Sequence, residues 1–168
     1  MAFSRAGIIG AGVMGEAMIV GLGRSGFKGN SIVIREKRVD RVSELVSQYG
    51  VTSGSLKDCD LLILAVKPQD SAATLAEIAP ELKGGALLVS LLAGTTTVKI
   101  EAALGSLVRV VRVMPNTPLL LGKGAAGVAK GSAATSADVA WVISLLSKSG
   151  MAIEVSEDLM DAVTATSG

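Results

Sequence analysis

Short apolar runs alternate along the chain with stripes of apolar residues at intervals of three and four. An uninterrupted run of about four to six apolar residues is typical of a strand buried on both faces, whereas a stripe predicts an amphipathic helix. The pattern predicts a mostly parallel sheet of about eight strands. The strands are expected at residues 6–9, 31–34, 51–52, 61–66, 86–92, 108–114, 125–129 and 151–155.

The helical stripes lie between these runs, at residues 14–22, 42–49, 75–82, 98–104, 139–146 and 157–165. Strands that alternate with helices are typical of an α/β fold, so we expect a doubly wound, Rossmann-like sheet with helices on both faces. Ser136 is expected to cap the fifth helix. Arg109 and Arg112 interrupt the sixth strand, which is therefore expected to be less buried than the fourth.

A glycine motif follows the first predicted strand and opens the first predicted helix, with Gly10, Gly12 and Gly15 in the spacing GxGxxG. In a dinucleotide site the first glycine permits the tight turn and the second lets the pyrophosphate approach the backbone. The third lets the helix pack closely on its strand. The second strand closes a βαβ unit by residue 35, which is the context that this motif requires.

The end of the second strand reads Arg35-Glu36-Lys37-Arg38, where a dinucleotide site normally contacts the adenosine ribose. Glu36 can accept hydrogen bonds from a ribose 2′-hydroxyl, which favours NAD. Lys37 and Arg38 can pair with a 2′-phosphate, which favours NADP. The stretch is also compatible with a solvated charged turn. Basic residues outnumber the acid, so we lean towards NADP and leave NAD open.

Three further loops follow the carboxyl ends of predicted strands, where open α/β sheets bind ligands. They read Ala65-Val66-Lys67-Pro68-Gln69, Ala93-Gly94-Thr95 and Met114-Pro115-Asn116-Thr117-Pro118. The two prolines that flank Asn116-Thr117 predict a rigid, extended loop. We expect these loops to contact the same ligand as the glycine motif.

The composition narrows the possible chemistry. The chain of 168 residues has a net charge of +1, one cysteine and no histidine, and only 2% of its residues are aromatic. Nucleic-acid binding is disfavoured, because there is no basic tract and little to stack on bases. Without histidine, any reaction is expected to rely on an organic cofactor, with no metal.

No apolar run reaches the ~20 residues of a membrane span, and a lone Cys59 suits a reducing compartment, so a cytoplasmic location is expected.

Three of these motifs together resemble the pyrroline-5-carboxylate reductase family: the glycine motif, AVKPQ at 65–69 and MPNTP at 114–118. The closing segment at 161–168 also matches. The resemblance implies reduction of the ring C=N bond of 1-pyrroline-5-carboxylate to L-proline, the last step of proline biosynthesis, with NADPH or NADH. It further implies an N-terminal Rossmann-type domain and a C-terminal helical domain that forms dimers and larger assemblies.

The resemblance also assigns cofactor contacts by position. It implies that the pyrophosphate is held at the glycine motif, the adenosine ribose at the end of the second strand, and the remainder of the cofactor along the other loops, with Asn116 near the nicotinamide. The implied cofactor-binding residues are Gly10, Gly12, Val13, Met14, Gly15, Glu36, Lys37, Arg38, Ala65, Val66, Lys67, Pro68, Leu92, Ala93 and Asn116.

The resemblance divides the chain into a dinucleotide-binding domain at residues 1–155 and the start of the helical domain at 156–168. The family's substrate-binding groups belong mostly to the remainder of the helical domain, so no catalytic residue can be assigned in this chain. We expect the chain alone to be nearly inactive and to be a monomer or weak dimer, whereas a full-length form is expected to be a homo-oligomer. The alternative is a non-catalytic nucleotide-binding module.

Overall fold

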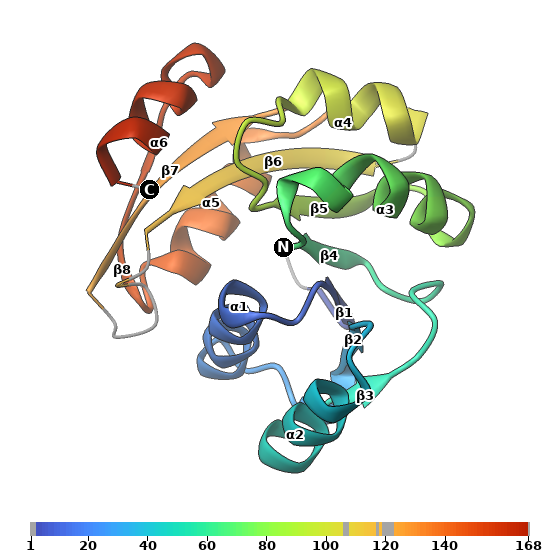
Figure 1. Ribbon diagram of the computed structural model, residues 1–168. Coiled ribbons are helices and arrows are strands. Elements are labelled where there is room, and N and C mark those ends of the chain that lie inside the picture. The colour runs from blue at the N-terminus through green and yellow to red at the C-terminus, as the bar shows by residue number, and fades with distance from the viewer. Residues whose placement is uncertain (1–2, 106–107, 117, 119–122, 168) are drawn as a thin grey trace.

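The computed structural model describes residues 3–105, 108–116, 118 and 123–167. These residues form an eight-stranded sheet in the order β3-β2-β1-β4-β5-β6-β7-β8 (Figure 1). Neighbouring strands are parallel except β6 and β7, which are antiparallel. The strands are β1 (Ala6–Ile9), β2 (Ile32–Arg35), β3 (Thr52–Ser53), β4 (Leu61–Leu64), β5 (Ala86–Ser90), β6 (Val108–Pro115), β7 (Gly124–Lys130) and β8 (Gly150–Glu154).

Helices cover both faces of this sheet, which confirms the doubly wound α/β class (Figure 1). One face packs against α1 (Val13–Arg24), α2 (Val39–Tyr49) and α5 (Ser136–Leu146). The other packs against α3 (Ser71–Ile78), α4 (Thr97–Leu104) and α6 (Met160–Ser167). The core is almost wholly aliphatic, since strands covered on both faces favour β-branched residues and leucine. The short 3-10 helices are η1 (Gly29–Ser31), η2 (Pro68–Asp70), η3 (Ala79–Glu81) and η6 (Glu157–Leu159).

The register of the central strands determines which loops meet at the carboxyl edge. Ile9, the last residue of β1, pairs with Arg35 at the end of β2 and with Leu64 at the end of β4. The three strands therefore end side by side. The residues that follow them, which begin at Gly10, Glu36 and Ala65, leave the sheet at the same place.

The expectation that β6 is less buried than β4 holds at Arg109 but not at Arg112. All residues of β6 except Arg109 are buried, and Arg112 is only 1% exposed. Arg112 donates to the carboxylate of Glu157 at 2.8 Å, and Arg109 forms an ion pair with the fully buried Asp138. A charge in a strand predicts exposure only where no partner is supplied from elsewhere in the fold.

The N-terminus of α5 also differs from the prediction. Thr135, not Ser136, caps the helix, and it forms a capping box in which the Asp138 carboxylate accepts the Thr135 backbone N–H at 2.8 Å. A capping box satisfies two backbone donors at once, which favours this boundary. Asp138 thereby caps the helix and neutralises Arg109.

The last described segment returns to the sheet. Met160 at the start of α6 is fully buried against Met114 and Ala129. The placement of a domain boundary at residue 155 stays a prediction.

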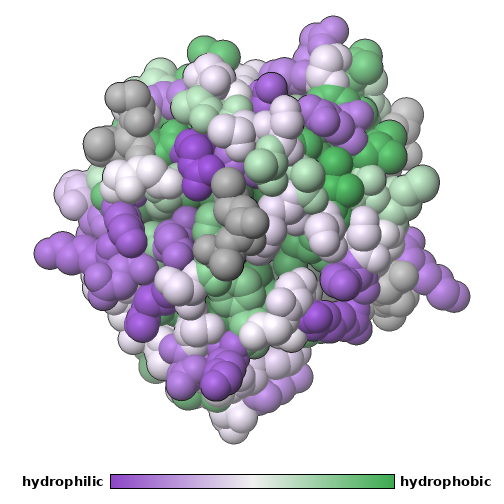
Figure 2. Space-filling view, turned by 180° about the vertical axis from the view of Figure 1, so that it is seen from behind, coloured by the Kyte–Doolittle hydropathy of each residue, from purple (hydrophilic) through white to green (hydrophobic). Residues whose placement is uncertain are grey.

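On the face turned away from the viewer in Figure 1, hydrophilic side chains are interspersed with hydrophobic ones (Figure 2).

Candidate functional site

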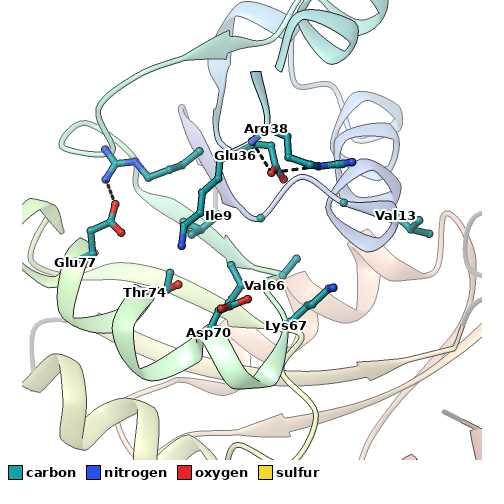
Figure 3. Close-up of a pocket in the computed structure, with 14 residues that line it drawn as sticks. Ile9, Val13, Glu36, Arg38, Val66, Lys67, Asp70, Thr74 and Glu77 are labelled. Carbon is teal, nitrogen blue, oxygen red and sulfur yellow. Dashed lines mark hydrogen bonds and ion pairs between the residues drawn. The ribbon is translucent and has the colours of Figure 1, made fainter. Parts of the chain in front are cut away.

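A cleft of about 750 Å³ opens at the carboxyl ends of β1, β2 and β4. Figure 3 shows that Glu36 and Arg38 border it on one side, while Val66, Asp70 and Thr74 lie across from them. This is the edge at which open α/β sheets bind ligands. The lining residues are Ile9, Gly10, Gly12, Val13, Arg35, Glu36, Lys37, Arg38, Ala65, Val66, Lys67, Asp70, Thr74 and Glu77.

The three glycines of the motif have different surroundings. Gly10 has φ +84°, and a Cβ there would lie 2.8 Å from the Ala65 carbonyl oxygen. A Cβ at Gly15 would overlap the Gly10 carbonyl oxygen. At Gly12, in contrast, no protein atom lies within 4 Å of an added Cβ. The chain itself requires glycine at 10 and 15, whereas glycine at 12 keeps space open in the cleft.

The N-terminus of α1 faces this space. Gly12 is the N-cap residue, and no side chain accepts a hydrogen bond from the first turn. The first backbone N–H groups of a helix lack partners within the helix, and its N-terminus carries partial positive charge. Val13, 60% exposed, lies at the margin of the cleft. The arrangement suits an anionic group such as a phosphate.

The charges at the end of β2 are arranged unequally. The Glu36 carboxylate accepts the backbone N–H groups of Ala11 at 3.0 Å and Arg38 at 3.1 Å. It also lies 3.7 Å from the Arg38 guanidinium, and only 12% of its side chain is exposed (Figure 3). Among the described residues no carboxylate pairs with Lys37 or Lys67. Each oxygen of the Glu36 carboxylate therefore already has a backbone partner, whereas the ammonium groups of Lys37 and Lys67 have no carboxylate partner among the described residues.

The opposite wall comes from η2 and α3. Asp70, Thr74 and Glu77 line it, with Thr74 buried and Glu77 at 3.6 Å from the Arg35 guanidinium. Arg35 also donates two hydrogen bonds to Glu81, at 2.7 and 3.0 Å. That hydrogen bonding, followed by a backbone N–H from Leu56, lowers the pKa of Glu81. Arg35 thus connects the end of β2 to the last turn of α3 through Glu77 and to η3 through Glu81.

Several predicted contacts do not line the cleft. Met14 is half-buried against the core, Gly15 is enclosed in α1, and Pro68 lies exposed at the start of η2. Leu92 is fully buried in the core, and Ala93 packs near Met160.

The side chain of Asn116 also lies outside the cleft lining. It accepts the Ala125 N–H at 2.9 Å, which extends the β6–β7 pairing by one residue. The rest of the predicted Asn116 loop falls partly outside the described residues, at Thr117.

The cleft also contains residues that the motifs did not indicate. Asp70, Thr74 and Glu77 are spaced by four and three, so they share one face of a helix that begins beside the cleft. A search for polar residues at helical spacing after Pro68 would have predicted these three residues. Ile9 and Arg35 are the last residues of strands that end in the site.

Comparisons with known proteins agree with this geometry. The family model described as "NADP oxidoreductase coenzyme F420-dependent" matches residues 5–94, which include every residue that lines the cleft. A pyrroline-5-carboxylate reductase of Corynebacterium melassecola is 36% identical over 96% of the chain. The chain spans 63% of that relative's length, and 62% and 56% of two others.

Solved structures give the same likeness. A pyrroline-5-carboxylate reductase from Coxiella burnetii matches 98% of the chain and 64% of its own length, with TM-score 0.90 and 31% identity. Plasmodium falciparum pyrroline carboxylate reductase with NADP bound matches 98% of the chain and 62% of its own length, with TM-score 0.81 and 29% identity. The resemblance carried by the sequence motifs is confirmed. None of the helices in the described part of the chain is long and apolar enough to cross a membrane.

Proposed function

Because the chain belongs to the family described as "NADP oxidoreductase coenzyme F420-dependent", we propose that its cleft binds NADPH as the hydride donor of a reductase. The substrate that we propose is 1-pyrroline-5-carboxylate, reduced at its C=N bond to L-proline. The named relatives support this choice, since they are pyrroline-5-carboxylate reductases that match nearly the whole chain. The family match, at residues 5–94, includes the whole lining of the cleft.

One observation carries the proposal: the open space above Gly12 at the uncapped N-terminus of α1. A Cβ at this position would meet no described residue beyond the chain neighbours within 4 Å, so the protein's own packing does not explain the glycine. A pyrophosphate that approaches the backbone does explain it. The helix N-terminus and the backbone N–H groups then supply the donors and the positive potential.

The charges at the end of β2 support NADPH over NADH. A ribose 2′-hydroxyl needs an acceptor, but the Glu36 carboxylate already accepts two backbone N–H groups. A 2′-phosphate needs cations, and Lys37 and the 60% exposed Arg38 side chain border the cleft. NAD remains the second candidate, because Glu36 stays within the lining.

Bound NADPH supplies a hydride to the C=N carbon of the substrate. The chain's own residues bind and orient the donor: Gly12 and the first turn of α1 on the pyrophosphate, Lys37 and Arg38 beside the ribose. Val66 and Lys67 contribute the wall that follows β4. Positioning of the two reactants accounts for the catalysis that such a site needs, without a nucleophile or metal from this chain.

The substrate-binding groups are proposed to lie in a C-terminal helical domain, since the chain spans 56–64% of the length of several curated relatives. By the same reasoning the dimer interface of the full-length protein is proposed to lie there. The 168-residue chain is then expected to bind cofactor, turn over little, and be a monomer or weak dimer. A cytoplasmic location stays a prediction.

A titration that follows nicotinamide fluorescence tests the proposal. We expect saturable binding of NADPH by the chain, and oxidation of NADPH by 1-pyrroline-5-carboxylate only in a version extended beyond Gly168. An extended version that binds NADPH and never oxidises it would favour a non-catalytic nucleotide-binding module. Absence of binding at millimolar cofactor would refute the site itself.

A further inference from the structure

Two side chains from outside the glycine turn hold both polar backbone atoms of Ala11. The Ala11 N–H donates to the Glu36 carboxylate at 3.0 Å, and the Ala11 carbonyl oxygen accepts from Nε of Arg41 at 3.1 Å. Ala11 itself is fully buried. The Gly10 N–H donates to the Arg35 carbonyl at 2.9 Å. These hydrogen bonds fix the orientation of the successive peptide groups from Ile9 to Gly12.

Arg41 is held in place by two carboxylates from different helices. It forms an ion pair with Glu16 of α1 and donates to Glu44 of α2 at 2.7 Å, and only 12% of its side chain is exposed. The hydroxyl of Tyr49 donates to the second oxygen of Glu16 at 2.7 Å. The hydrogen bond from Arg41, followed by that from Tyr49, lowers the pKa of Glu16, so the carboxylate stays charged at neutral pH.

The orientation of the Ala11–Gly12 peptide follows from this contact. In a trans peptide the C=O and N–H groups point in opposite directions, and the described residues include no cis bond. The Ala11 carbonyl points towards Arg41, so the Gly12 N–H points the other way. Among the described residues none accepts a hydrogen bond from the Gly12 N–H, and Gly12 lines the cleft.

We propose that Arg41 is a positioning residue for anion binding: by holding the Ala11 carbonyl, it presents the Gly12 N–H to a phosphate in the cleft. The inference rests on the proposed function for the identity of that anion, the cofactor's pyrophosphate. Arg41 touches no ligand in this role. It acts through one peptide group, and Glu16 and Tyr49 act through Arg41.

The lysine variant separates this role from charge alone. Arg41→Lys keeps the cation near Glu16 but removes the planar fork that reaches Glu16, Glu44 and Ala11 together. We expect NADPH to bind about tenfold more weakly, because a hydrogen bond to a charged group is lost or misaligned. Binding of adenosine 2′-phosphate, which lacks the pyrophosphate, should stay unchanged. Arg24→Lys at the far end of α1 is the matched control and should leave both affinities unchanged.

The Arg41 inference fails if Arg41→Lys weakens adenosine 2′-phosphate as much as NADPH, since that result indicates general disruption of the site. It also fails if neither affinity changes. A wild-type measurement avoids dependence on the variant's folding: inorganic pyrophosphate is titrated while the Gly12 amide is followed by NMR. We expect the Gly12 amide proton to shift downfield with saturation, and the absence of a shift would overturn the inference even if NADPH binds.

The same titration distinguishes this inference from the proposed function. A protein that binds no NADPH but shifts its Gly12 amide with pyrophosphate would refute the cofactor and keep the Gly12 anion site, through which Arg41 is proposed to act; the Arg41→Lys variant then tests Arg41 with pyrophosphate as the probe. A protein that binds NADPH but shows no shift of the Gly12 amide with pyrophosphate would support the proposed cofactor and refute the Arg41 inference.

Discussion

At the scale of single residues, the glycine motif combines two kinds of constraint. Gly10 and Gly15 are required by contacts within the chain, because any Cβ would collide with the backbone of the turn. Gly12 is constrained only by what enters the cleft. One sequence pattern therefore contains positions that control stability and a position that controls binding.

This difference predicts unequal effects of substitution on the free energy of unfolding. Gly15→Ala should lower the free energy of unfolding by about 1–3 kcal/mol, as overpacked sites commonly do. Gly12→Val should change it by less than about 1 kcal/mol, since its side chain enters open space. Urea denaturation of the two variants measures both values. Equal destabilisation would contradict the assignment of separate roles.

The charges beside Glu36 lead to a prediction about cofactor choice. Lys37→Gln should raise the dissociation constant for NADPH about fivefold to tenfold, because a charged partner for the 2′-phosphate is removed. The dissociation constant for NADH should not change. Calorimetric titration with both cofactors provides the comparison, and a parallel loss for NADH would mean that Lys37 does not contact the 2′-phosphate.

At the scale of elements, β6 connects the sheet to the last helix through a buried charge. Arg112 is 1% exposed and donates to Glu157 at the start of η6, and the same carboxylate oxygen accepts the Thr97 N–H at 3.2 Å. Without Glu157 the buried guanidinium keeps only the exposed Asp161 carboxylate of α6, at 3.4 Å. Removing one partner of a buried pair costs more than replacing both.

Glu157→Gln should therefore destabilise the protein by about 1–3 kcal/mol, a value reduced from that of a fully buried pair because Glu157 is 26% exposed. The double variant Arg112→Met, Glu157→Gln should recover part of this loss. Both are measured by urea denaturation. If the double variant is as unstable as the sum of the single variants, the two residues act independently.

The sequence predicted the elements better than their surroundings. Apolar runs located the central strands β1, β4 and β5 most clearly, because burial on both faces leaves an unambiguous pattern. Strand ends shifted by one or two residues, as at β4, which ends at Leu64 where the chain turns into the cleft. The burial of Arg112 was mispredicted, since a local pattern does not reveal a partner 45 residues later.

The site was predictable where it follows a strand and not where it lies on a helix. The residues after β1, β2 and β4 line the cleft together because parallel strands end at one edge. Thr74 and Glu77 belong to a helix face whose direction depends on packing, so no motif marks them. Asn116 was predicted from the position of its loop and from the resemblance, and Leu92 from the resemblance. In the described chain Leu92 lies in the core and Asn116 bonds to β7.

At the scale of the whole molecule, three carboxylates, Glu16, Asp60 and Glu81, couple folding to pH, because the fold lowers the pKa of each. Hydrogen bonds from Arg35 and the Leu56 backbone lower the pKa of Glu81, and those from Arg41 and Tyr49 lower the pKa of Glu16. A carboxyl group with a lowered pKa in the folded state binds fewer protons there than in the unfolded chain. Its stabilisation is present above the unfolded pKa of about 4.3 and is lost as pH falls through the folded value.

The free energy of unfolding should therefore decrease as the pH is lowered below about 4.5. Glu81→Gln removes one of the three groups, so the decrease should be shallower in that variant than in the wild type. Urea denaturation at a series of pH values measures the slope. A slope unchanged by the substitution would show that Glu81 does not contribute.

The central claim is that the cleft above Gly12 binds NADPH, and calorimetric titration of wild type and Gly12→Val with NADPH tests it most directly. We predict saturable binding to the wild type and an affinity at least about tenfold weaker for the variant, because valine occupies the space of the pyrophosphate. Equal affinities in two folded proteins would contradict the claim, as would a wild type that binds no NADPH.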